Sequence, residues 1–321
     1  MSSSCPENPD EKAGALMQLS LSEDQTQILD FIDSLTRPYA TVPMHDISFA
    51  LTSAELDREL TEGGFLDVAA MPELGPVTAA LVVERLARLP YAVEAAASAL
   101  VRLLVDPDLP RPLCLVEEGQ LRRPVRFLKQ GASVVVVGEG GVRSFTAQAE
   151  HVRDAGDEVL FAYPMAYLTG IPADARRHPV SADEVRRAWR VALAAEAAGL
   201  LAAGLQSVTT YVSERKQFGR PIATFQALRH RLAELQVLTN GTYWLALRAA
   251  GTGDPGDAAL AVLHAQDAAK RAGYDFHQFL GAMGMTLEHP LHLWTYRLKA
   301  LTGELGGRGG NAVAAAEAIW G

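Results

Sequence analysis

Two short runs carry the residues whose types and spacing could do chemistry. The first spans 214–221, reads ERKQFGRP, and is followed by Gln226. An arginine at a helix end can hold a phosphate through a two-pronged hydrogen bond, and a phenylalanine can cover a flat ring. Arg215, Phe218 and Gln226 therefore predict a site for an anion joined to a ring. Composition alone also allows a plain charged helix end with Phe218 in the core.

The second run spans 277–290 and reads HQFLGAMGMTLEHP, which includes Gln278, Gly281, Ala282 and Glu288. Gly281 has no side chain, so its backbone can approach a bound group closely. Glu288 could act as a general base if its surroundings raised its pKa. The alternative is a glutamate that only favours the start of the following helix through the helix dipole.

Composition excludes several classes of protein. The chain has 321 residues, is 49% hydrophobic and carries a net charge of −9, so a large core is expected and a nucleic-acid-binding face is not. Only Cys5 and Cys114 occur, which argues against a disulfide framework and against a CxxC zinc site. The histidines show no metal spacing, so no metal is expected. A reduced cytoplasm is the expected location.

No membrane segment is expected. The most apolar stretch, 191–208, is built largely of Ala, Leu and Gly and contains Glu196. It is shorter than the roughly 20 residues that a membrane helix needs. The first residues have neither a basic start nor an apolar core, so they do not form a signal peptide. Segment 1–20 is predicted to be a disordered tail.

The elements that position the two runs follow from hydrophobic periodicity. Helical spacing predicts an N-terminal helical domain over 21–106, whose first helix follows a capping box at Ser22. Its other helices are predicted at 53–61, 76–88 and 93–105. Short Val-rich and Phe-rich runs then predict a reduced β domain over 107–181, with strands at 125–128, 133–137, 142–145 and 159–163.

The helical period returns in the C-terminal part. Four long helices are predicted at 182–213, 221–251, 256–281 and 290–305, and they form a four-helix bundle over 182–321. Small residues recur at helical spacing in the first of them, which lets neighbouring helices pack closely. The predicted fold class is therefore mostly α with a small β insert. Both runs fall at helix–helix corners of the bundle.

The two runs resemble the C-terminal domain of the acyl-CoA dehydrogenase family. That family has a Tyr, then Arg-x-x-Phe-Gly-x, then a Gln a turn into the next helix, and the matching residues are Tyr211, Arg215, Phe218, Gly219 and Gln226. It also has Gln-x-x-Gly-Gly-x-Gly, where Gln278 and Gly281 fit and Ala282 replaces the second glycine. The resemblance is strongest over 205–235 and 274–305, and it implies the acyl-CoA dehydrogenase fold.

The resemblance also implies FAD as the cofactor. In the family these Arg, Phe, Gln and Gly positions contact the pyrophosphate and adenylate end of the FAD of a neighbouring subunit. The residues expected to do so here are Arg215, Phe218, Gln226, Gln278, Gly281 and Ala282. Glu288 is expected to be the catalytic base, which removes the α proton of an acyl-CoA as the flavin takes the β hydride. Electrons would then pass to an electron-transfer flavoprotein.

The β region departs from the family. The family's larger middle domain has an Ala-x-Thr-Glu-Pro-type loop and a Trp-x-x-Thr/Ser strand that hold the isoalloxazine ring, and neither occurs here. The family's Tyr-Glu-Gly-Thr is replaced by LTGELGG at 301–307. Such shortened chains resemble the small subunits of heteromeric, α2β2 acyl-CoA dehydrogenases of actinobacterial steroid and cholesterol catabolism. The resemblance therefore implies a longer homologous partner that supplies the flavin-facing β domain.

Three hypotheses follow. In the first, the chain is an enzyme subunit that desaturates an acyl-CoA, possibly one derived from a steroid, together with its longer partner. In the second, it is a non-catalytic scaffold that only completes the partner's FAD adenylate site. In the third, it is a homodimeric dehydrogenase with an eroded β domain. None of them requires nucleic acid, metal or membrane, and the acyl-CoA is not identified by the sequence.

Overall fold

The computed structural model describes residues 20–45 and 48–321, so the predicted tail at 1–20 lies almost entirely outside the described residues. Three helices open the described chain: α1 (Glu23–Thr36), α2 (Ala54–Glu62) and α3 (Gly75–Ala87). The predicted capping box is present, because the Ser22 hydroxyl accepts from the Gln25 amide at 3.1 Å and the Gln25 side chain accepts from the Ser22 amide at 3.0 Å. The first three predicted helices are therefore confirmed.

The fourth predicted helix, 93–105, begins later than expected. Its regular part comprises a π-helical turn at Ser98–Arg102 and then α4 (Leu103–Val105). The side chain of Glu94 explains the delay, because it accepts bonds from the Ser98 amide at 3.0 Å and from the Ser98 hydroxyl at 2.6 Å. Glu94 is thus turned back to satisfy the first free amides of this helix and is not part of it.

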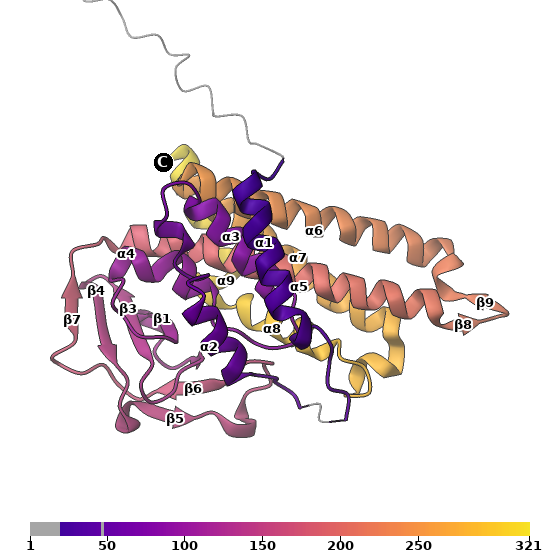
Figure 1. The fold of residues 1–321 in the computed structure, drawn as a ribbon, viewed down its shortest axis with the longest axis horizontal. Coiled ribbons are helices and arrows are strands. Elements are labelled where there is room, and N and C mark those ends of the chain that lie inside the picture. Colours follow the sequence, from indigo (N-terminus) through magenta and orange to yellow (C-terminus); the bar gives the residue numbers. More distant parts are fainter. Residues whose placement is uncertain (1–19, 46–47) are drawn as a thin grey trace, which may run out of the picture.

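The β region forms two small sheets below helices α2 and α4 (Figure 1). The first has the order β1-β3-β4-β7, with β1 parallel to β3 and the other pairs antiparallel. Its strands are Leu113–Glu117, Ser133–Gly138, Gly141–Thr146 and Arg176–His178. The second is antiparallel with the order β2-β6-β5. Its strands are Pro124–Arg126, Met165–Leu168 and Val152–Asp154.

The strands predicted at 133–137 and 142–145 are confirmed as β3 and β4, which pair as an antiparallel hairpin. Every residue of β3 is buried, as expected for its run of four valines. The predicted strand at 159–163 is wrong, because the strand nearby is β6. Tyr163 instead turns its hydroxyl toward Glu196 at 2.7 Å, and Pro164, which cannot donate to a ladder, follows it. Strands β1, β5 and β7 were not predicted, and β5 and β7 have only three residues each.

Helix α5 (Ala182–Glu214) is the central element of the fold. Its 33 residues correspond to about 50 Å, and it runs from the sheets to the far end of the molecule (Figure 1). It packs against α3, α6, α7 and α8. By length and composition it could cross a membrane, but most of its apolar part is buried inside the protein. Its many alanines allow this burial on several sides.

The other bundle helices are α6 (Gln226–Thr252), α7 (Pro255–Leu280), α8 (His292–Leu301) and α9 (Gly307–Trp320). The prediction of four helices is incomplete, because the last predicted helix ends at Leu301 and the glycine-rich start of α9 hid a further helix. Helix α8 is tied to the N-terminal helices by Arg297, which donates to the carbonyls of Leu89 at 2.6 Å and Tyr91 at 3.1 Å. The N-terminal helices and the bundle thus share one core.

The closest helix approach in this core supports a test of packing. A Cβ at Gly199 on α5 would overlap the Glu84 carbonyl oxygen of α3 and lie 2.8 Å from the Ala87 Cβ. We expect Gly199→Ala to lower the free energy of unfolding by about 1–3 kcal/mol, because overpacking outweighs the helix propensity of alanine. Gly273→Ala on α7, where a Cβ meets open space, should instead raise it by about 0.5–1 kcal/mol. Urea unfolding of both variants measures the difference, and equal effects would contradict it.

Candidate functional site

The first predicted run forms a hairpin that projects from the end of α5. Its strands are β8 (Lys216–Gln217) and β9 (Arg220–Pro221), and they lie at the tip of the bundle farthest from the sheets (Figure 1). Phe218 and Gly219 form the turn with φ of 53° and 77°. Two positive φ values are typical of a tight hairpin turn, but they are uncommon for a phenylalanine. The Phe218 side chain is 90% exposed.

Phe225, which the sequence did not single out, anchors this hairpin. Its ring centroid lies 6.0 Å from that of Phe218, and the Arg220 guanidinium lies 4.3 Å from it. The Ile222 amide donates to the Arg215 carbonyl at 2.8 Å and closes the base of the hairpin. The Arg215 side chain is exposed and, within 20–45 and 48–321, makes no ion pair. Gln226 is exposed and is the first residue of α6, not one turn into it.

The second predicted run ends α7. Gly281 has φ 58° and ψ −133°, a conformation that is open to glycine and strained for other residues, so the backbone turn itself requires this glycine. Gln278, Gly281 and Ala282 are all exposed. His277 stabilises the turn, with its Nδ1 2.7 Å from the Gly284 carbonyl and its Nε2 3.0 Å from the Thr295 hydroxyl. Burial lowers the pKa of His277 and favours the neutral ring.

The fold brings the two runs together at one end of the bundle. The Tyr211 ring, just before the hairpin, packs edge-on against the His289 ring of the second run with centroids 5.5 Å apart. Each of the predicted cofactor-binding residues faces solvent in the single chain. The surface therefore presents a free guanidinium, an aromatic ring and two amides. These groups suit a phosphate-bearing ligand with a ring.

Glu288 lies in this second run but is exposed. It is not among the residues that line the large hollow between the sheets and the bundle. The described part of this chain therefore does not shield the Glu288 carboxylate from water. Its role as a base stays a prediction, and a covering surface would have to come from outside the described residues.

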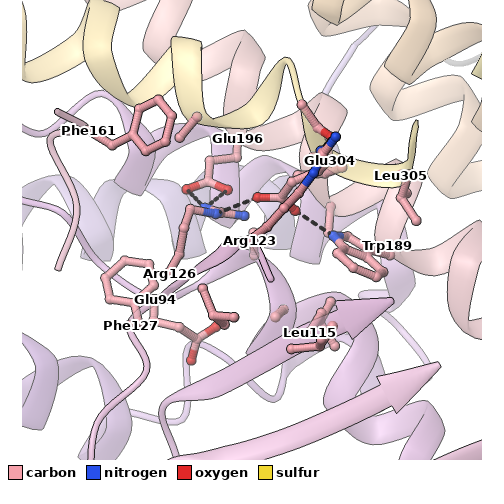
Figure 2. Close-up of a pocket in the computed structure, with 18 of the residues that line it drawn as sticks. Glu94, Leu115, Arg123, Arg126, Phe127, Phe161, Trp189, Glu196, Glu304 and Leu305 are labelled. Atoms are coloured by element: carbon pink, nitrogen blue, oxygen red, sulfur yellow. Dashed lines mark hydrogen bonds and ion pairs between the residues drawn. The ribbon is translucent and has the colours of Figure 1, made fainter. Parts of the chain in front are cut away.

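A cavity of about 500 Å³ lies between the sheets and the bundle, at the other end of α5. We call it the sheet–bundle cavity, and it is formed by β1, β2, α5, the loop before α4 and the end of α8. Arg126 of β2 lies inside it, between Glu196 of α5 and Glu304 (Figure 2). Its Nη1 is 2.9 Å from the nearer Glu196 oxygen and its Nε is 2.6 Å from Glu304 Oε1.

Each carboxylate in this cluster has its own donors. Tyr163 donates to Glu196 at 2.7 Å, and the indole of Trp189 donates to Glu304 at 2.8 Å. Burial opposes the charge of Arg126, but the two carboxylates outweigh it and raise its pKa well above the usual range. Burial, together with Glu196, also raises the pKa of Tyr163, which stays protonated as a donor. Arg126 is therefore the counter-ion that the two cavity carboxylates share, and Tyr163 and Trp189 supply neutral donors beside it.

This cluster was not predicted from the sequence. Glu196 is conspicuous inside an apolar helix, but Arg126 fell in a predicted strand and Glu304 had no predicted function. The usable signal was a pair of opposite charges, each inside a buried apolar run, because such charges need a partner. The residues that pair lie 70 and 178 positions apart in the sequence, so spacing could not join them.

Arg126 allows a test of the cluster. Its side chain is 16% exposed, and those of Glu196 and Glu304 are 6% and 20% exposed. We expect Arg126→Met to lower the free energy of unfolding by about 3–5 kcal/mol, because two buried carboxylates lose their counter-ion. Arg58→Met removes the exposed pair with Glu62 and should cost under about 0.5 kcal/mol. Urea unfolding at neutral pH compares them, and similar losses would refute a structural role for the cluster.

Known proteins share sequence with the bundle and share the fold of the chain. Residues 187–309 match the family described as acyl-CoA dehydrogenase, C-terminal domain. This segment, which holds most of the bundle, is thus similar to the C-terminal domain of acyl-CoA dehydrogenases. The curated relative FadE34 of Mycobacterium tuberculosis, an acyl-CoA dehydrogenase, is 35% identical over 156 residues, which are 46% of this chain and 22% of FadE34. The chain spans between 22% and 39% of the length of three such relatives.

Two solved structures share the acyl-CoA dehydrogenase fold over nearly the whole chain. A chain of the ChsE4–ChsE5 complex from Mycobacterium tuberculosis has a TM-score of 0.74 at 19% identity, covering 95% of this chain and 100% of that one. A chain of the Tcur3481–Tcur3483 steroid ACAD has a TM-score of 0.75 at 22% identity, covering 94% and 98%. At these identities the likeness shows the fold. The predicted fold class is confirmed.

Proposed function

We propose that this chain is a subunit of an FAD-dependent acyl-CoA dehydrogenase and acts together with a longer homologous subunit. The observation that carries the proposal is the exposed surface at the hairpin end of the bundle. Arg215, Phe218 and Gln278 project there from two segments joined by the contact of Tyr211 with His289. None of them lines the chain's own sheet–bundle cavity, which lies at the other end of α5, and this supports a ligand that belongs to a neighbouring subunit.

The chemistry of these groups fits the adenylate end of FAD. Arg215 offers a planar cation for the pyrophosphate, and Phe218 offers a ring face for the adenine. Gln226 and Gln278 offer amides, and open space surrounds the α-carbon of Gly281, so a ligand can approach the backbone there. Ala282 adds only a methyl group beside this approach. These residues would hold the cofactor by its nucleotide part.

The reaction class follows from the family. FAD, when bound, accepts the hydride that leaves the β-carbon of an acyl-CoA. The part played by this chain is to position the cofactor, and Glu288 would accept the α proton once a partner covers it. A covering surface matters because desolvation would bring a carboxylate closer to the pKa that the task requires.

The assembly and substrate are proposed on similar grounds. Two solved structures of the same fold are named as two-chain assemblies, and one of them is a steroid ACAD. This supports an α2β2 heterotetramer and a steroid-derived acyl-CoA as substrate. An electron-transfer flavoprotein would reoxidise the cofactor, and the cytoplasm would be the location. Neither nucleic acid nor membrane has a role in this scheme.

A second candidate function is a non-catalytic scaffold. Two observations favour it: Glu288 is exposed, and the cavity carboxylates Glu196 and Glu304 are both bound to Arg126. In that case the chain would complete the partner's adenylate site and supply no base.

The adenylate site is tested by the retention of cofactor. We expect Arg215→Met, in the complex purified with its longer partner, to weaken FAD binding about tenfold or more, because a charged hydrogen bond to phosphate is lost. Arg122→Met is a matched control, since Arg122 is exposed and does not line the sheet–bundle cavity. The flavin absorbance per complex after dialysis measures the loss.

Two outcomes would overturn this part of the proposal. One is equal FAD retention by the Arg215 and Arg122 variants. The other is a yellow, active homodimer formed by this chain alone, which would remove the need for a longer partner.

The base is tested separately in the same complex. We expect Glu288→Gln to lower turnover of acyl-CoA by about 100-fold or more while FAD content stays unchanged. Glu317→Gln, an exposed carboxylate on α9, is the control. Unchanged turnover would rule out Glu288 as the base and favour the scaffold. A loss in Glu304→Gln instead would place proton removal in the sheet–bundle cavity.

A further inference from the structure

The second predicted run does more than end α7, because it also leads into α8. The helical turn starts before α8 itself, since the Leu293 amide donates to the Pro290 carbonyl at 3.0 Å. Proline is favoured at the first position of a helix, where its missing N–H has no partner to lose. The residue before this proline is His289. His289 thus occupies the position from which a side chain caps a helix.

The ring of His289 takes the part of a capping side chain. Its Nδ1 accepts a hydrogen bond from the Leu291 amide at 3.2 Å. A capping residue satisfies the amide two or three positions ahead in the same way, usually with a side-chain oxygen of Ser, Thr, Asp or Asn. An imidazole nitrogen can accept only while it carries no proton. The cap therefore exists only in the neutral form of the ring.

The surroundings of His289 oppose a positive charge on its ring. Tyr211 faces it from α5, His292 is the nearby titratable group on α8, and Glu288 precedes it but is exposed. Within 20–45 and 48–321, no carboxylate forms an ion pair with the ring. The positive end of a helix dipole also disfavours a cation at this position. Burial is the main cause that lowers the pKa of His289, and the charge of His292 lowers it further.

The cap stands at the boundary between a fixed helix and an exposed stretch of chain. On the helix side, the Trp294 indole donates to the Arg88 carbonyl at 3.0 Å, which ties the start of α8 to the N-terminal helices. On the other side, residues 285–288 are all exposed. His289 is half-buried, so it is the first side chain that holds the chain again after the turn at Gly284. Loss of the cap would therefore loosen this stretch and the first turn of α8.

We propose that His289 is a proton-sensitive cap, whose neutral ring holds the start of α8 and whose protonation loosens segment 285–295. Protonation replaces the accepting nitrogen by an N–H that faces the Leu291 amide, so an attraction becomes a repulsion.

The direction of the pH effect follows from linkage. The pKa of His289 lies below its ordinary value of 6.5 in the folded chain, so the unfolded segment binds the proton first as the pH falls. The protection that the cap gives is therefore complete above about pH 6.5 and is lost as the pH falls below it.

The consequence for the complex rests on the proposed function. Segment 285–295 includes Glu288 and follows Gly281 and Ala282, so its loosening would disturb the surface proposed to hold the cofactor. Acidification would then weaken the retention of FAD in the complex. The cap itself is inferred from the contacts of His289 and requires no cofactor.

Amide hydrogen exchange of the full-length chain at about pH 5.5 and about pH 7.5 tests the cap without cofactor or turnover. After correction for the intrinsic exchange rates, we expect segment 285–295 to be about fivefold less protected at the lower pH, the effect of losing one cap. His289→Asn keeps an accepting oxygen that does not titrate, so its protection should be equal at the two pH values. His289→Phe keeps a ring beside Tyr211 but no acceptor, so its protection should be about fivefold lower at both.

His230→Asn is the control, because His230 is exposed on α6 and lies outside the segment, so this variant should keep the pH dependence of the unchanged chain. Equal protection of the unchanged chain at the two pH values, or full protection in His289→Phe, would overturn the cap. A pH dependence that persists in His289→Asn would also overturn it, since the effect would then belong to another group such as His277 or His292. Each of these failures leaves the proposed function intact, because that is read from FAD retention through Arg215 in the complex.

Discussion

The burial of helix α5 is the constraint on which the rest of the structure depends. A helix that touches α3, α6, α7 and α8 cannot carry large side chains on every face. Its alanines and Gly199 meet this demand, and the closest approach is to the α3 backbone. The same helix places Trp189 and Glu196 beside the sheets and Tyr211 beside the hairpin. The packing of this one helix thus fixes the distance between the sheet–bundle cavity and the hairpin.

The two ends of α5 differ in how their charges are satisfied. At the sheet end, Glu196 is buried, so the chain had to supply a counter-ion, and Arg126 from β2 does so. At the hairpin end, Arg215 is exposed, and water can satisfy it while a ligand is absent. The first arrangement is complete within one chain and joins the sheet to the bundle. The second is available for an outside partner, which is why the proposed cofactor contact lies there.

Local patterns predicted much of the fold. The Ser22 capping box, the valines of β3 and the alanine spacing of α5 each depend on neighbouring residues, and each gave the correct element. The errors arose where distant contacts decide. Tyr163 does not lie in the predicted strand, because its hydroxyl donates to Glu196. The helix after Glu94 begins later than predicted, because the Glu94 side chain accepts from its first amides. Helix α9 was missed because glycine at its start reads as a turn.

The same division applies to the candidate sites. The hairpin residues lie close together in the sequence, so their spacing could indicate a ligand, and the fold then explains their exposure through the positive φ of Phe218. The cavity cluster joins residues from separate elements, which no spacing could bring together. Arg126 has both of its carboxylate partners inside the fold, whereas Arg215 forms no ion pair within 20–45 and 48–321. Arg215 lies at the base of a projecting hairpin, on the same surface as an exposed aromatic ring and two amides, and this combination favours a negatively charged ligand from outside the chain.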